Sequence, residues 1–281
     1  MGNRVNLSFG LIVILVLASC EEADITGMFV SGESVNQRFE QSIEWNTIHP
    51  FRQIRTSTDD YTILSNGDSH IGGTRNLDSL FACAWHKGAE AVVLVGDITT
   101  GHEEDFSILE QHLPSQDTLP TFLLPGNHDL YFDGWPEFFS RFGSSTYLFT
   151  IQTPVATDLY ICLDTGGGTL GNRQLDWLKE TLRNLRSDHR RCVIFTHNNL
   201  FRFRRTTSTN PNVEEVVVLL EIFVGYEVDI VITAHDHKRY TEEFGNTRHI
   251  VMDASKDGLD NAGYLQLNVT DGKIEYQFRN F

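Results

Sequence analysis

Polar residues that can do chemistry follow short apolar runs at five places in the sequence. In chain order they are Asp-x-His at 68–70, Gly-Asp at 96–97, Gly-Asn-His-Asp at 126–129, a histidine at 197 and His-x-His at 235–237. Carboxylate, amide and imidazole groups are oxygen and nitrogen ligands for divalent cations. Each cluster alone is more typical of a turn, but five of them, holding five of the 11 histidines, favour a metal centre.

The segments between the clusters predict the elements that must position them. Runs such as AVVLV at 91–95 are typical of strands buried on both faces. Residues 76–88 place Leu77, Leu80, Phe81, Ala84 and Trp85 on one helical face. Strands that alternate with helices predict βαβ units and a mostly parallel sheet. Because sites in such sheets form at the carboxyl ends of strands, we expect the polar clusters to meet there.

Further helices are predicted at 105–112, from Pro136 onward, at 172–185 and at 213–223. The last part of the chain changes pattern, and it predicts two hairpins that turn at 245–246 and 271–272. Two packed sheets flanked by helices, in one domain at 59–281, are therefore the expected architecture. Residues 20–58 form a tether and an N-terminal extension, in which a capping box at 34–37 predicts a short helix.

The first 19 residues have the character of an export signal. Arg4 precedes an apolar run at 11–17 that is too short to span a bilayer. The sequence Leu-Ala-Ser-Cys at 17–20 is similar to a bacterial lipobox, which predicts a lipid on Cys20 that anchors the exported protein to the cell envelope. A plain signal peptide is the alternative, and both the periplasmic and the surface side of the envelope stay open.

The composition excludes some classes of protein. The net charge of -16 argues against general affinity for nucleic acid or anionic lipid. Besides Cys20, the cysteines are Cys83, Cys162 and Cys192, and each lies in an apolar stretch. Three is an odd number and no C-x-x-C spacing occurs, so buried free thiols are expected rather than disulfides or a thiolate metal site.

Taken together, the five clusters resemble those of the calcineurin-like metallophosphoesterase superfamily, over roughly residues 61–253. The resemblance implies an α/β fold of four layers, αββα, with two mixed, largely parallel sheets around two metal ions. It assigns one ion to Asp68, His70, Asp97 and His237, and the other to Asp97, Asn127, His197 and His235. His128 matches the histidine that protonates the leaving group, whereas Asp129 either orients His128 or stabilises the turn.

The implied activity is hydrolysis of a small-molecule phosphate ester by a water that bridges two divalent or trivalent ions. Ligands without sulfur suit Fe, Mn or Zn. Monoester and diester substrates both stay open, because loops such as 198–212, including Arg202, set specificity. The alternative is a non-catalytic surface lipoprotein that uses the fold as a binding scaffold. Ala234 stands where the family usually has glycine, and its methyl group fits only if its φ is negative.

Overall fold

A computed structural model describes residues 32–50, 52–200 and 213–281 of the chain. The predicted signal segment, Cys20, residues 21–31 of the tether and Arg202 lie outside these residues. Within the described ranges, no helix combines the length and the apolar character that crossing a bilayer requires.

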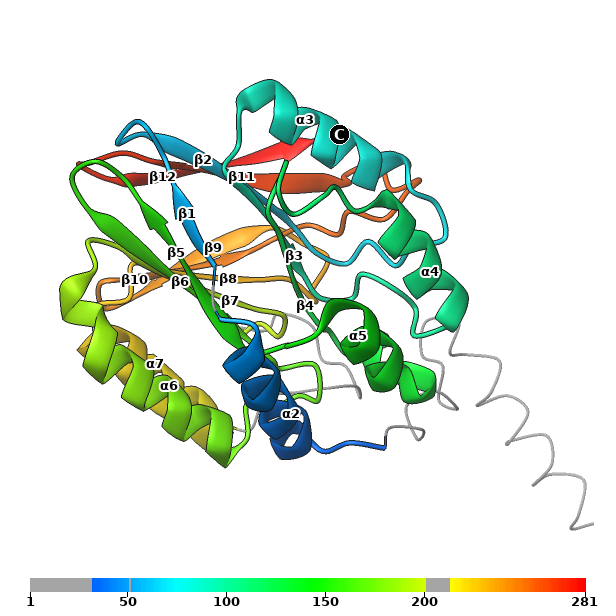
Figure 1. Ribbon diagram of the computed structural model, residues 1–281, viewed down its shortest axis with the longest axis horizontal. Helices are drawn as coiled ribbons and strands as arrows, with labels where there is room; N and C mark the ends of the chain where they lie inside the picture. Colours follow the sequence, from blue (N-terminus) through cyan, green and yellow to red (C-terminus); the bar gives the residue numbers. More distant parts are fainter. Residues whose placement is uncertain (1–31, 51, 201–212) are drawn as a thin grey trace, which may run out of the picture.

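Two mixed β-sheets form the centre of the molecule (Figure 1). The larger sheet has seven strands in the order β1-β5-β6-β7-β8-β10-β9. Its parallel pairs are β1 with β5, β6 with β7, β7 with β8 and β8 with β10. The strands of this sheet are β1 (Gln53–Arg55), β5 (Tyr147–Gln152), β6 (Thr157–Leu163), β7 (Cys192–Thr196), β8 (Ile230–Thr233), β9 (Tyr240–Phe244) and β10 (Thr247–Val251).

The smaller sheet has five strands in the order β12-β11-β2-β3-β4. Strands β2, β3 and β4 run parallel, and β11 joins β2 and β12 in antiparallel fashion. Their bounds are β2 (Tyr61–Asn66), β3 (Ala91–Val95), β4 (Thr121–Leu124), β11 (Gly263–Val269) and β12 (Ile274–Asn280). The two predicted hairpins are present as β9–β10 and β11–β12.

Helices cover the outer face of each sheet, which gives the predicted four layers. An apolar cluster between the sheets joins Ile63 and Val93 of the smaller sheet to Phe149 and Phe195 of the larger one. A second cluster packs three helices on the smaller sheet, and a third packs two helices on the larger sheet. These helices are α3 (Arg75–Lys87), α4 (Glu103–His112), α5 (Gly134–Phe142), α6 (Asn172–Leu185) and α7 (Val213–Gly225). The α/β sandwich is confirmed.

The N-terminal extension is part of the fold. Helix α2 (Val35–Ile48) begins with the predicted capping box, in which Ser34 and Gln37 satisfy each other's backbone groups. Arg38, although 2% exposed, donates two hydrogen bonds to Asp164 at 2.8 and 3.1 Å. Because breaking a buried ion pair of this kind costs about 3–5 kcal/mol, it fixes α2 to the end of β6. Strand β1 then extends the larger sheet.

Some local predictions were wrong in detail. Helix α5 begins at Gly134, before Pro136, and a 3₁₀ segment η2 (His128–Asp133) precedes it. Trp85, predicted on the same face of α3 as Leu77 and Leu80, is 56% exposed, whereas Ala84 beside it is buried. A further 3₁₀ turn, η3 (Arg186–Asp188), follows α6.

The cysteines at 83, 162 and 192 are free thiols, as predicted, with Cys83 only partly buried.

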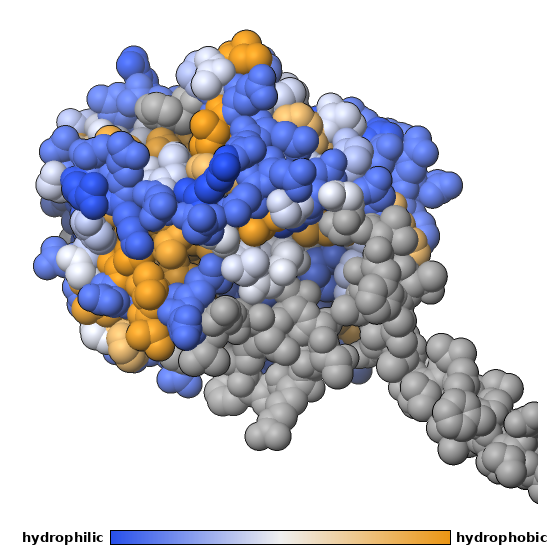
Figure 2. All heavy atoms as spheres, turned by 90° about the horizontal axis from the view of Figure 1, so that it is seen from below, coloured by the Kyte–Doolittle hydropathy of each residue, from blue (hydrophilic) through white to orange (hydrophobic). Residues whose placement is uncertain are grey.

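The surface has the polar character that the composition implies. Figure 2 shows a face on which hydrophilic side chains dominate and apolar areas interrupt them. Exposed large apolar side chains are scattered over several elements, with Val217 on α7 and Ile48 on α2 among them. Single exposed apolar residues are normal for a soluble surface and indicate no particular partner.

Candidate metal centre

The polar clusters converge at the carboxyl ends of parallel strands from both sheets. Asp68, Asp97 and Asn127 follow β2, β3 and β4 of the smaller sheet, whereas His197 and the His-x-His pair follow β7 and β8 of the larger sheet. In each of three groups the ligand atoms lie within 4.8 Å of one another, and these groups are Asp68, His70 and His237; His70, Asp97 and His128; and Asp97, His197 and His235. Six of the seven predicted ligands therefore lie in these groups, and the placement of the seventh, Asn127, is described below.

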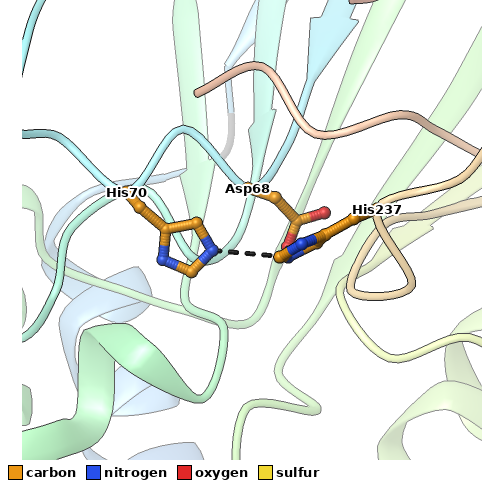
Figure 3. A group of neighbouring side chains, drawn as sticks. All are labelled: Asp68, His70 and His237. Atoms are coloured by element: carbon orange, nitrogen blue, oxygen red, sulfur yellow. Dashed lines mark hydrogen bonds and ion pairs between the residues drawn. The ribbon is translucent and has the colours of Figure 1, made fainter. Parts of the chain in front are cut away.

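The first group is drawn in Figure 3, where the rings of His70 and His237 and the carboxylate of Asp68 point toward one another. The Nε2 atoms of His70 and His237 are 3.4 Å apart. His237 Nε2 is also 3.4 Å from Asp68 Oδ1. Separations of this size leave room for one cation at usual metal–ligand distances of about 2.0–2.2 Å from each atom.

The group of Asp97, His197 and His235 is more deeply buried than the first group. His197 Nε2 lies 3.3 Å from Asp97 Oδ2 and 3.1 Å from His235 Nδ1. The other ring nitrogen of His197 is 2.9 Å from the carbonyl oxygen of Val95. If Nδ1 carries the proton and donates to that carbonyl, Nε2 has a lone pair for a cation, which is the usual arrangement of a ligating histidine.

Asp97 belongs to the group of His197 and His235, and it also lies close to His70 of the first group. Its Oδ2 is 3.3 Å from His197 Nε2 and 4.0 Å from His70 Nε2. Its Oδ1 accepts a hydrogen bond of 2.7 Å from the backbone N–H of His128. A carboxylate that reaches both sets of imidazoles has the position expected of a bridging ligand.

Asn127 offers an amide oxygen that lacks a donor. Its Nδ2 donates to the hydroxyl of Tyr131 at 3.1 Å, and this contact sets which way the amide faces. Its Oδ1 is buried and has no hydrogen-bond partner among the described residues. Since a buried polar atom without a partner costs about 1–3 kcal/mol, an orphaned oxygen at this position fits a cation ligand.

His128 lies at the edge of the centre, half-buried. Its ring makes an edge contact with the ring of His70, with centroids 4.4 Å apart, and a tilted contact with Tyr131 at 4.6 Å. A histidine that touches the ligand cluster and still reaches solvent can exchange a proton with a bound molecule. This position is compatible with the predicted proton donor.

Asp129 stabilises the turn rather than the imidazole. Its fully buried carboxylate accepts hydrogen bonds from the backbone of Ile98, Thr99 and Gly126, at 3.2, 2.7 and 2.8 Å, and from the Thr99 hydroxyl. Burial, with the charge of Asp97 as a second cause, raises the pKa of Asp129 to about 6. These bonds tie the loop after β3 to the loop after β4, so that Asp97 and Asn127 are held together.

Left-handed backbone conformations gather at the centre. The φ angles of the ligand residues concerned are positive: Asp68 53°, His70 39°, Asp97 49°, His235 71° and His237 55°. Such conformations cost of order 1–3 kcal/mol each and cluster at functional sites. Neighbouring glycines allow the close approach, because a Cβ on Gly96 would overlap the ring of His197 and one on Gly126 would overlap Asp97.

The charges of the centre depend strongly on one another. Burial alone would raise the pKa of Asp97, but the adjacent His197 holds that pKa well below its usual range. Burial disfavours the charged imidazolium and would by itself lower the pKa of His197. The attraction of Asp97 is larger, and it raises the pKa to about 9. For His70 burial prevails and lowers the pKa to about 4. A cation at the site would take the place of the imidazolium proton beside Asp97.

Ala234 fits its position. It does not have a positive φ, and it is fully buried. Its methyl group lies against Gly67, where an added Cβ would overlap it. The departure from the usual glycine is thus accommodated by the glycine that precedes Asp68, without displacing the histidines that follow.

Comparison with known proteins agrees with this geometry. The family model described as calcineurin-like phosphoesterase matches residues 61–239, which is more than half of the chain. The chain belongs to this family. No curated protein matched the chain significantly.

Several solved structures have the same fold as this chain, although their sequence identity to it is low. A dimetal phosphatase from Danio rerio is 15% identical with a TM-score of 0.61, over 78% of this chain and 96% of that one. GAP50, described as the anchor in the inner membrane complex of Plasmodium, is 13% identical with a TM-score of 0.61, over 79% and 84% of the two chains. One neighbour is thus named for catalysis and the other for anchoring, so the fold alone does not decide activity.

Sequence reasoning missed several polar residues around the ligands. Tyr131 holds the Asn127 amide, and Asn199 contacts Asp236 inside the His-x-His turn. Asn199 and Tyr131 follow the site residues of their clusters by two or three positions, and that proximity was the available signal. What each of them contacts depends on the loop conformation, which no spacing rule predicts.

Proposed function

We propose that this protein hydrolyses phosphate esters with the help of two metal ions. The observation that carries the proposal is the convergence of two ligand groups, Asp68, His70 and His237 on one side and Asp97, His197 and His235 on the other, with Asp97 between them. The family match to calcineurin-like phosphoesterases supports it. The substrate is a small molecule that carries a phosphomonoester or phosphodiester.

The residues of the chain would hold the two metal ions, orient the substrate and supply a proton. The first ion would be held by Asp68, His70, Asp97 and His237, and the second by Asp97, Asn127, His197 and His235. Fe, Mn or Zn suits this oxygen and nitrogen set. When bound, two such ions lower the pKa of a water and compensate charge on the phosphoryl oxygens.

The charges of the ligands favour binding of the substrate, and the exposure of His128 allows this residue to donate a proton. Asp68 and Asp97 are the anionic ligands, whereas the other ligands are neutral, so two bound ions leave net positive charge that attracts a phosphate. The chain has a net charge of -16, and this local positive charge counteracts its repulsion of a phosphate. His128, half-buried beside His70, is placed to give a proton to the departing oxygen, which is typically worth 10²–10⁴-fold in rate.

The alternative is a binding scaffold without catalysis. The likeness to GAP50, a protein described as an anchor, favours this alternative. The half-buried His128 beside the ligands favours the enzyme, because a scaffold that only binds metal or another ligand needs no proton donor.

The decisive experiment is a substrate panel on purified full-length protein. Apoprotein prepared with a chelator is reconstituted with Mn²⁺, Fe²⁺ or Zn²⁺ and assayed with aryl and alkyl phosphomonoesters and phosphodiesters. We expect metal-dependent release of phosphate or alcohol with at least one class. Metal-bound protein that hydrolyses none of these esters, under conditions where both sites are filled, would support the scaffold instead.

We also propose that the mature protein starts at Cys20, carries a lipid there and is anchored to the cell envelope. The support is the Leu-Ala-Ser-Cys sequence after the apolar run. Mass spectrometry of the membrane fraction should find a diacylated N-terminal peptide from wild-type cells, and Cys20→Ser should abolish it. An unmodified peptide that begins elsewhere would point to a plain signal peptide.

A further inference from the structure

We propose that Asn199, Asp236 and Tyr240 form a positioning device that holds the loop after β7 and the turn after β8 at the separation that their metal ligands need. This inference rests on the proposed metal centre, but it concerns residues that contribute no ligand atom. Asn199 follows His197 by two positions, Asp236 lies between His235 and His237, and Tyr240 begins β9.

The three side chains are in direct contact. Asn199 Nδ2 donates to Asp236 Oδ2 at 2.8 Å, and the same amide contacts the Tyr240 hydroxyl. Burial, with the nearby Asp236 carboxylate as a further cause, raises the pKa of Tyr240. Asn199 is 1% exposed and Asp236 is 7% exposed. Buried polar contacts of this kind hold one geometry, because each broken bond leaves a desolvated group.

The turn that Asp236 occupies needs such support. His235 and His237 both have left-handed backbone conformations, with φ of 71° and 55°, and the Asp236 N–H donates to the Ala234 carbonyl at 2.9 Å. Strained backbone of this kind persists only where surrounding contacts determine it. At its two ends the turn is held by His235 N–H, which donates to Asp68, and by Arg239, which binds Asp253. Asp236 is its central attachment, and it joins the turn to the loop of His197.

The consequence for metal binding follows from where the ligands sit. His197 Nε2 and His235 Nδ1 are 3.1 Å apart and belong to one ligand group, yet they come from different loops. A bond between Asn199 and Asp236 fixes the two loops beside that group. Partners outside the ligand sphere typically change metal affinity or activity 10–100-fold when they are removed.

The test measures metal affinity directly. Apoprotein of the full chain is titrated with Mn²⁺ by calorimetry and with Co²⁺ by visible absorption, whose bands report the ligand geometry. Asp236→Ala and Asn199→Ala should each raise the apparent Kd of one site about 10–100-fold and alter the Co²⁺ bands. The double variant should be little worse than either single one, because one contact is lost in all three. Asp236→Asn keeps an acceptor oxygen and should remain close to wild type.

Asp229→Ala is the matched control. Asp229 joins the same two strands at their opposite ends, where its Oδ2 accepts from the Cys192 N–H at 2.8 Å. The Asp229→Ala substitution should lower the melting temperature and leave the metal affinities of both sites unchanged. If Asp236→Ala behaves in the same way, with unaltered Kd and Co²⁺ bands, the contact serves the fold alone and the inference is overturned.

A fold defect and a failure of the proposed function give different results. If the alanine variants do not fold, Asn199→Asp replaces the donor with an isosteric carboxylate, and it should weaken metal binding where Asp236→Asn does not. Equal Kd values for these two variants would overturn the inference. Wild-type protein that binds neither Mn²⁺ nor Co²⁺ would overturn the metal centre itself, and this result does not depend on any Asp236 variant.

Discussion

The two ends of the sandwich both bury carboxylates, but they partner them differently. At the amino ends of the strands, fully buried Asp158 accepts hydrogen bonds from Arg190 at 3.0 and 2.6 Å and from the Tyr61 hydroxyl at 2.7 Å. At the carboxyl ends, Asp68 and Asp97 face imidazole rings, and Asn127 Oδ1 has no donor within the described structure.

This difference distinguishes a carboxylate with a structural role from carboxylates that belong to a binding site. Asp158 has its positive partner in the chain, so its burial requires nothing more. The carboxyl end instead gathers acceptors and lone pairs around a common centre and places several residues in strained backbone conformations. Buried groups that the chain does not satisfy indicate a partner from outside, and a pair of cations matches the atoms present.

The largest effect should come from Asp97, whose carboxylate lies between His70 of one ligand group and His197 of the other. Asp97→Ala should remove metal from both sites and lower kcat/KM by more than about 10³-fold, beyond the roughly 10–100-fold that a residue outside the ligand sphere costs. Metal content by mass spectrometry and phosphoesterase rates measure the two losses. Full occupancy of both sites in this variant would contradict the bridging role, and Asp271→Ala, an exposed carboxylate at the other end, is the control.

His128 should separate catalysis from metal binding. His128→Ala should lower kcat by about 10²–10⁴-fold, because the leaving group loses its proton donor, while metal content stays near that of wild type. The surface histidine His112, which contacts Asp78, provides a control substitution without effect on the rate. An unchanged kcat in His128→Ala would remove this residue from the mechanism.

Asp158 tests the opposite end of the comparison. Asp158→Ala should lower the free energy of unfolding by about 3–5 kcal/mol, since it leaves the largely buried Arg190 without its main partner. Urea unfolding of the apoprotein measures the change. Metal affinity and kcat should be unaffected, and a loss of bound metal would show that the two ends are not independent.

Tyr131 should give the smallest of these effects. Tyr131→Phe keeps the ring beside His128 but removes the hydroxyl that accepts from the Asn127 amide. We expect the affinity for the ion held by Asn127 to fall about tenfold, which calorimetric titration can resolve. Tyr147→Phe deletes a hydroxyl that bonds the Leu123 carbonyl, away from the ligands, and should leave the affinity unchanged. Equal affinities in both variants would mean that the amide is oriented by other contacts.

Most of the fold could be predicted from local patterns. The apolar runs before Asp68, Asp97 and His197 are strands, because a continuous apolar segment of that length is buried on both faces of a sheet. The capping box at Ser34 starts a helix, and the Gly245 turn closes a hairpin, since each signal acts over a few residues.

What could not be predicted depends on contacts between distant residues. The 3₁₀ segment at His128 and the exposure of Trp85 are set by packing that periodicity does not contain. The contact between Asn199 and Asp236 joins residues 37 positions apart, and the left-handed conformation of His237 follows from the turn around it. The ligand types could therefore be named from the sequence, whereas the residues that orient them could not.

The most direct test of the two-ion cage is anomalous scattering from a crystal of the Mn²⁺-loaded full-length protein. We expect two peaks about 3.5–4 Å apart, one beside Asp68, His70 and His237 and the other beside Asn127, His197 and His235, with the Asp97 carboxylate between them. Peaks elsewhere on the molecule, or a single peak with Asp97 facing away from it, would contradict the proposed two-ion centre.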